Sequence, residues 1–202
     1  MLNGNKNVDN KVREVVSGVS TTELTACVPV YKTWTATEAA LGAADGCHAS
    51  VTALTTVITV SADITQPSTP RNVTITTAKG GGTNMSGDVV FTGTNIWGQV
   101  ITDTLAEAAD GLVTGTVAFK TITSILVPVR VQAGDALTFG YGAKLGMDVF
   151  LPNTSCVIKQ IKTATAQTLP TVVVDADEIE KNTVTMNAAL NGSVEIIYFF
   201  TH

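Results

Sequence analysis

The chain has 202 residues, of which 45% are hydrophobic and 14% charged, and its formal net charge is −5. A negatively charged chain does not suit a phosphate backbone, so we expect no nucleic-acid partner. No uninterrupted apolar run reaches the ~18 residues of a membrane helix, and charged residues occupy the start, where an export signal is apolar. We therefore expect no membrane partner and a protein that is made in the cytoplasm.

Residues 1–50 are predicted to form an N-terminal arm followed by a short helical segment. The first 20 residues or so are polar and rich in Asn, apart from an apolar patch that begins at Val12, Val15 and Val16 and ends at Val19. This patch could form one or two helical turns, but it is too small to build a core of its own. We expect the arm to become ordered only against another surface, and we predict Val12, Val15 and Val16 as partner-binding residues.

One short helix is predicted at residues 38–44, after Tyr31 and Trp34. The segment is rich in Ala, Thr37 could cap its start, and Asp45-Gly46 would end it. The two aromatic residues are expected to pack this helix against a sheet rather than to stack on a ligand.

Residues 51–202 are predicted to form a mainly β domain, an antiparallel sandwich or barrel-like body. Apolar residues and Thr alternate with a period near two, which is typical of half-buried strands. The expected strands lie at 51–60, 72–77, 88–92, 99–105, 117–131, 144–151, 156–161, 171–174 and 193–200. Pro67 and Pro70 each lack a backbone N–H, so residues 63–72 are expected to form an extended connector rather than an internal strand.

Two hairpins are predicted in this domain, at residues 88–105 and 117–142. Trp97 lies in the turn of the first, where it could anchor a protein interface or fold back over the sheet edge. We predict Trp97 as a further partner-binding residue. The glycine run after Lys79 lacks the order of a phosphate-binding loop, so it is expected to be a plain hairpin loop.

The residue types needed for catalysis are scarce. His48 is the internal histidine and is expected to have a packing role, and no nucleophile with a base beside it stands out. Residues 175–180 form an acidic cluster, but the order of an EF-hand is missing, so a solvated turn is favoured over a calcium site. We expect a protein that is not an enzyme and that has no cofactor and no metal.

Three cysteines, Cys27, Cys47 and Cys156, make an odd number without a close pair. The favoured interpretation is that all three are reduced and act as small buried apolar side chains. A disulfide between Cys27 and Cys47 is the less favoured alternative.

Several blocks of the chain resemble a family of small β-rich structural proteins of tailed bacteriophages. They are, in order, ITQPSTPRNVTIT, GDVVFTGTNIWGQVITDTL, GTVAFKTITSILVP, GDALTFGYGAKLGM and VDADEIEKNTVTMNAALNGSVEIIYFF, and the likeness covers about residues 55–202. Members are usually associated with the virion head as auxiliary or decoration proteins, and the family supplies no active-site residues.

The resemblance implies a capsid decoration protein that binds the outer surface of the phage head and stabilises the capsid lattice. Its partners would be the major capsid protein and further copies of itself, and its location would be the virion, assembled in the host cytoplasm. The charged share of 14%, against about 25% in average domains, fits a surface that partners cover in part, although Thr can also solvate a sheet face. The alternative is a head-fibre or tail-associated module that binds a receptor or glycan.

Overall fold

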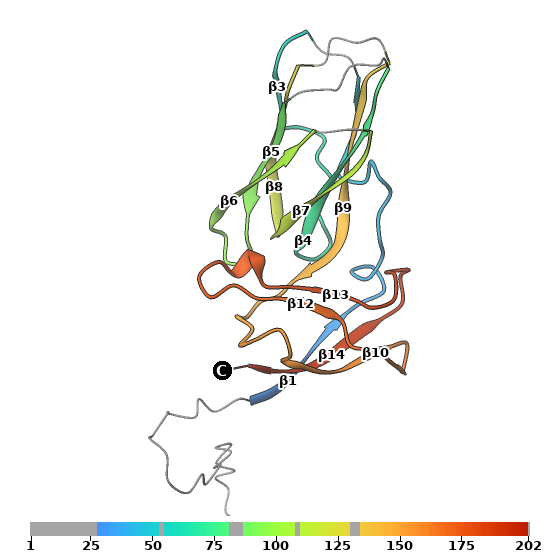
Figure 1. Ribbon diagram of the computed structural model, residues 1–202, viewed down its shortest axis with the longest axis vertical. Helices are drawn as coiled ribbons and strands as arrows, with labels where there is room; N and C mark the ends of the chain where they lie inside the picture. Colours follow the sequence, from blue (N-terminus) through green and yellow to red (C-terminus); the bar gives the residue numbers. More distant parts are fainter. Residues whose placement is uncertain (1–27, 53–54, 81–86, 108–109, 130–133, 202) are drawn as a thin grey trace, which may run out of the picture.

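The computed structural model describes residues 28–52, 55–80, 87–107, 110–129 and 134–201, and it is mainly β (Figure 1). The paired strands are antiparallel, which confirms the predicted fold class. The elements are β1 (Val28–Trp34), β2 (His48–Thr52), β3 (Ile58–Val60), β4 (Arg71–Ala78), β5 (Asp88–Thr94), β6 (Val100–Ala106), β7 (Gly111–Phe119), β8 (Thr121–Val127), β9 (Ala136–Gly146), β10 (Val157–Lys162), β11 (Thr165–Gln167), β12 (Thr171–Val173), the 3₁₀ turn η1 (Ile179–Lys181), β13 (Thr183–Thr185) and β14 (Glu195–Thr201). No helix in the described ranges is long and apolar enough to cross a membrane.

The strands form three sheets around two hydrophobic cores. One sheet has the order β3-β8-β5-β6, a second β12-β13-β9-β4-β7 with β2 on β9, and a third β1-β14-β10-β11. The first core lies between the first two sheets and contains Ile75, Phe91 and Phe139. The second core contains Trp34 and Ile197 and lies where the third sheet closes the lower end of the molecule in Figure 1. Strand β9 is long enough to contribute to both cores.

Asn72 holds the irregular junction between β4 and β9. The register of the two strands shifts between Arg71 and Val73, and the buried Asn72 side chain fills the gap. Its Oδ1 accepts a hydrogen bond from the Lys144 backbone N–H at 3.0 Å, and its Nδ2 donates to the Gly115 carbonyl at 3.1 Å. One amide thus joins β4, β9 and β7 at the centre of the second sheet.

The prediction of a helix at 38–44 is wrong. The structure has only a single capped turn at the start of this segment. The Glu38 carboxylate accepts hydrogen bonds from the Thr35 N–H and hydroxyl, both at 2.9 Å. The chain does not continue as a helix because the buried Arg71 guanidinium donates to the carbonyls of Glu38 and Ala40, each at 2.8 Å. These are carbonyls that a helix would need for its own hydrogen bonds.

Residues 28–50 belong to the β structure rather than to a separate segment. β1 pairs along its whole length with β14, and β2 pairs with β9. The boundary expected after residue 50 therefore falls inside β2, and Trp34 lies in the second core instead of packing a helix. Val12, Val15 and Val16, the predicted partner-binding residues of the arm, lie outside the described residues.

The first predicted hairpin is confirmed and the second is wrong. β5 and β6 pair in register from Asp88 opposite Ala106 to Thr94 opposite Val100. In contrast, Lys120 separates two strands that enter different sheets, β7 beside β4 and β8 beside β5, and β9 pairs with neither of them as a hairpin. Both β7 and β8 are half buried, so apolar and polar residues remain interspersed on both sides of Lys120 without a break. The sequence pattern therefore does not show where the chain passes from one sheet to the other.

The proline-containing connector is found as predicted up to Pro70, but Arg71 and Asn72, which were expected to belong to it, already lie in the internal strand β4. Pro67 and Pro70 are buried. The Gln66 side chain joins the connector to β8 by two hydrogen bonds. The Gln66 side chain accepts from the Ile122 N–H at 2.7 Å and donates to the Ile122 carbonyl at 2.9 Å.

Candidate functional site

The turn between β5 and β6, which we call the hairpin tip (residues 95–99), is held in one conformation by the buried Asn95. Its Oδ1 accepts from the backbone N–H groups of Trp97 at 3.0 Å and Gln99 at 3.1 Å. Its Nδ2 donates to Gln99 Oε1 at 2.8 Å and to Glu180 Oε2 at 3.1 Å. Gly98 has φ +79°, a conformation that L side chains rarely adopt. The tip is thus fixed both to itself and to η1.

Trp97 presents an aromatic ring at this tip. The residue is 52% exposed, and its ring meets Phe150, in the loop after β9, edge to face with centroids 5.3 Å apart. Of the two roles that the sequence left open, the structure shows that the ring packs back on the body in part, while about half of the residue remains exposed to solvent. Because a neighbouring ring already restrains it, Trp97 could bind a partner with little loss of side-chain entropy.

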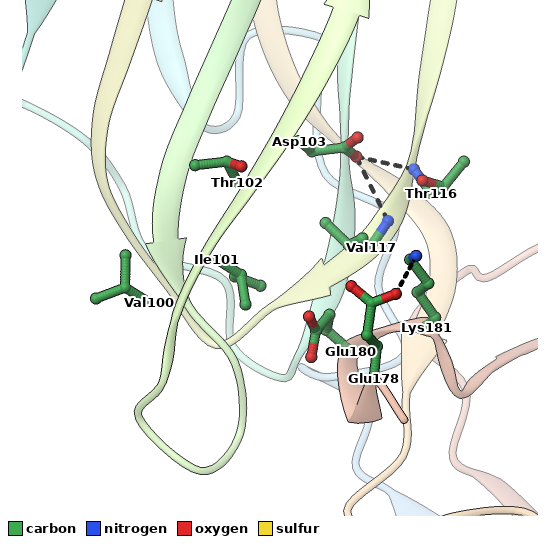
Figure 2. Close-up of a pocket in the computed structure, with 9 residues that line it drawn as sticks. All are labelled: Val100, Ile101, Thr102, Asp103, Thr116, Val117, Glu178, Glu180 and Lys181. Atoms are coloured by element: carbon green, nitrogen blue, oxygen red, sulfur yellow. Dashed lines mark hydrogen bonds and ion pairs between the residues drawn. The ribbon is translucent and has the colours of Figure 1, made fainter. Parts of the chain in front are cut away.

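A depression of about 370 Å³ lies beside the hairpin tip, between β6, β7 and η1 (Figure 2). Glu180, which receives the hydrogen bond from Asn95, is one of its lining residues, so the tip and the depression share η1. The other lining residues are Val100, Ile101, Thr102, Asp103, Thr116, Val117, Glu178 and Lys181. Val100 is 76% exposed and forms the apolar rim nearest the tip.

The lining of the depression carries more negative than positive charge. Asp103 accepts hydrogen bonds from the N–H groups of Thr116 at 2.8 Å and Val117 at 3.4 Å, so this carboxylate is fixed in place. Glu178 forms an ion pair with Lys181. The lining therefore contains three carboxylates, those of Asp103, Glu178 and Glu180, and one ammonium group, that of Lys181. This excess of negative charge favours a ligand that carries a positive charge or N–H donors.

The acidic segment 175–180 forms a bend that leads into η1. The Asp175 carboxylate accepts hydrogen bonds from the N–H groups of Asp177 and Glu178, both at 2.9 Å. These two hydrogen bonds favour the charged form and lower the pKa of Asp175. Within the described part of the chain, no group of three His, Cys, Asp or Glu residues is placed to hold a metal ion.

The two described cysteines are free and buried, and His48 has the expected packing role. Burial raises the pKa of the Cys47 thiol to about 11 and also raises that of Cys156, which disfavours the thiolate form that reacts as a nucleophile. The His48 ring lies edge to face with Phe139, and its Nδ1 is 2.8 Å from the Ala49 carbonyl oxygen. Cys27 lies outside the described residues.

No protein-family model, curated protein or solved structure matches this chain. Of the predicted site residues, the structure places Trp97 at the hairpin tip; Phe150 and Glu180 were not predicted as its neighbours. An Asn at the start of a short hairpin turn is a recognisable signal for Asn95, whereas nothing in the local sequence around Phe150 points to the tip.

Proposed function

We propose that this chain is a capsid decoration protein of a bacteriophage, a non-catalytic structural protein that binds the outer surface of the head through the hairpin tip. The observation that carries the proposal is the Trp97 ring, half exposed on a turn that Asn95 fixes. The resemblance of residues 55–202 to phage head proteins and the low share of charged residues support the same role.

The composition of the tip suits a protein partner. Trp is among the residues that most often dominate the binding energy of an interface, especially where the surrounding contacts exclude water. Phe150 packs against the ring and Val100 adds exposed apolar surface at the start of β6, and the carboxylates of the depression can pair with Lys or Arg of a capsid subunit. Apolar anchoring and charge complementarity would together set the orientation of docking.

Stabilisation of the lattice follows from linkage. A decoration protein that contacts two neighbouring capsid subunits binds the assembled lattice better than separate subunits, so its binding free energy adds to the stability of the particle. Each contact can be modest because many copies act on one shell. Decorated heads should then withstand heat better than bare heads.

The experiment compares the Trp97→Ala variant with wild-type protein in titrations of expanded, undecorated capsids. We expect the variant to bind about 30-fold more weakly, which corresponds to the loss of about 2 kcal/mol at an aromatic anchor. Val57→Ala is the matched control, because Val57 is also exposed and precedes β3, far from the tip in Figure 1. Equal binding of Trp97→Ala and wild type would show that the tip is no anchor, and failure of wild-type protein to bind or stabilise any capsid would refute decoration itself.

A receptor- or glycan-binding module is the second candidate, because an exposed ring beside a depression with fixed carboxylates also suits a sugar. The aromatic share of 5% argues against this role, since glycan sites usually need several stacking rings. Copy number in purified particles separates the two functions. Hundreds of copies would support decoration, whereas a handful would support an adhesin.

A further inference from the structure

The third sheet has a largely apolar outer surface, which we call the terminal face. Its register pairs Pro29 with Phe200 and Tyr31 with Tyr198 across β1 and β14, and Ile196 with Ile161 across β14 and β10. Two polar residues share this face, because Thr33 lies opposite Ile196 and the exposed Lys159 lies opposite Tyr198. The intervening residues of β14, Ile197 and Phe199, are buried in the second core. The side chains of the terminal face therefore point away from the second core, and the strands that carry them, β1, β14 and β10, form the lower end of the body in Figure 1.

This composition is unusual for the outer side of an antiparallel sheet, where polar residues normally alternate with buried apolar ones. Tyr31 is 69% exposed and Tyr198 37%, and their rings lie 6.0 Å apart. Ile158, at the bulge of β10, adds a further apolar side chain that is 51% exposed. Apart from Thr33 and Lys159, the apolar side chains adjoin one another along β14, and an apolar patch of this kind is often a docking site.

The area of the terminal face limits what can cover it. Three strands spaced ~4.8 Å apart and about seven residues long give a surface of ~14 Å by ~23 Å, or roughly 300 Å². A stable protein interface buries about 800 Å² on each partner, so two copies joined through this face alone would form a weak dimer. A short amphipathic segment fits the area better.

The N-terminal part of the chain contains such a segment. In residues 12–19, VREVVSGV, the valines stand at i, i+3, i+4 and i+7, the spacing of one helical stripe. Eight residues of helix are ~12 Å long, which matches the width of the terminal face. Both the pattern and the length suit a two-turn element lying across β1, β14 and β10.

The connection makes the contact easy to reach. Residues 20–27 lead from this segment into Val28, the first residue of β1, which is itself the edge strand of the third sheet. Fully extended, they span about 26–29 Å, which is more than the length of the face. A segment tethered so closely has an effective concentration of about millimolar, which favours docking within one chain over docking between chains.

We propose that residues 12–19 dock on the terminal face of their own chain and cover Tyr31 and Tyr198. The contact does not depend on the decoration role. It shields an apolar surface in the free protein, and it occupies Val12, Val15 and Val16 until a partner releases them.

The test uses the full chain with the double substitution Val15→Asp and Val16→Asp, and Ser17→Asp as the matched control on the opposite side of the stripe. The readouts are fluorescence of anilinonaphthalene sulfonate, which binds exposed apolar surface, and amide hydrogen exchange of β1 and β14. We expect the double variant to raise the fluorescence several-fold and to speed exchange in both strands, with Ser17→Asp like wild type. Deletion of residues 1–19 should give the same result as the double variant.

Two results would overturn the proposal. In the first, the double variant and Ser17→Asp behave alike in both readouts, which would mean that the valine stripe does not touch the terminal face. In the second, sedimentation shows that wild-type protein is a dimer and that the double variant is a monomer, which would assign the segment to the face of a second copy.

Discussion

Replacement of Asn95 by Ala should destabilise the whole protein although the residue lies in a turn. The substitution removes the two hydrogen bonds from the Trp97 and Gln99 N–H groups and the two donated to Gln99 and Glu180. The bond to the buried Glu180 carboxylate is worth about 1.5–3 kcal/mol, because its acceptor is charged. The neutral bonds near the surface add roughly 1 kcal/mol together, because water replaces much of them.

The expected loss is thus about 3 kcal/mol in the free energy of unfolding. For a protein of this size, 1 kcal/mol shifts the melting temperature by about 2–4 °C, so thermal unfolding followed by circular dichroism should show a decrease of roughly 6–12 °C. Trp97→Ala serves as the comparison, since it removes a half-exposed ring and leaves the Asn95 hydrogen bonds in place. We expect that variant to lose about 1 kcal/mol, the worth of its contact with Phe150.

Asn95→Asp tests the link to η1 separately. The variant can still accept the two backbone N–H groups, but it places a carboxylate against Glu180 instead of a donor. Because the like charges repel, it should be less stable than wild type and should melt at a lower temperature. If Asn95→Ala changed the melting temperature by less than 2 °C, or if Asn95→Asp melted at the same temperature as wild type, the hydrogen bonds of Asn95 would not hold the tip.

Further expectations follow from the buried groups of the fold. Gly142→Ala should lower the free energy of unfolding by about 2 kcal/mol or more, because the added Cβ would lie 2.4 Å from the Asn72 amide. In a double-mutant cycle, the same substitution should cost less in an Asn72→Ala background. If the two costs simply added, the clash with Asn72 would be disproved. Cys47 should resist iodoacetamide at pH 8 in the native protein and react once denaturant is added, because burial raises its pKa to about 11; peptide mass spectrometry measures this, and rapid native labelling would contradict it. The charged Asp175 carboxylate is stabilised in the folded state, which lowers its pKa. Its contribution to the stability of the fold is therefore present above about pH 4 and is lost as the pH falls through the lowered pKa. Urea titrations of wild type and Asp175→Asn should therefore converge as the pH is lowered, and a constant difference would refute this cause.

The sequence predicted the features that depend on local chemistry. The hairpin at 88–105 follows from alternating residues around a turn that contains Asn95 and Gly98, and the connector follows from Pro67 and Pro70. These signals lie within a few residues of the structure they specify.

The features that were missed depend on contacts distant in sequence. β1 contains Pro29 and shows no strong alternation; it is a strand because β14, at the other end of the described chain, supplies its partner. The Ala-rich segment after Thr35 has helical propensity, but two carbonyls that a helix would use accept hydrogen bonds from Arg71 instead. Phe150 comes to the hairpin tip through the path of the loop after β9, which no local pattern specifies.

The pairing of β1 with β14 has a mechanical consequence. Val28 lies opposite Thr201, so the two strands enter and leave the third sheet at the same point. A force that pulls residues 28 and 201 apart would load the antiparallel pairs one after another, as in opening a zipper, and would meet little resistance. A force transmitted from residue 28 into the body would instead pull along β1 and load its pairs together. In the proposed decoration role, attachments that pull on this sheet lengthwise would therefore hold an expanding shell far more firmly than attachments that separate its two ends.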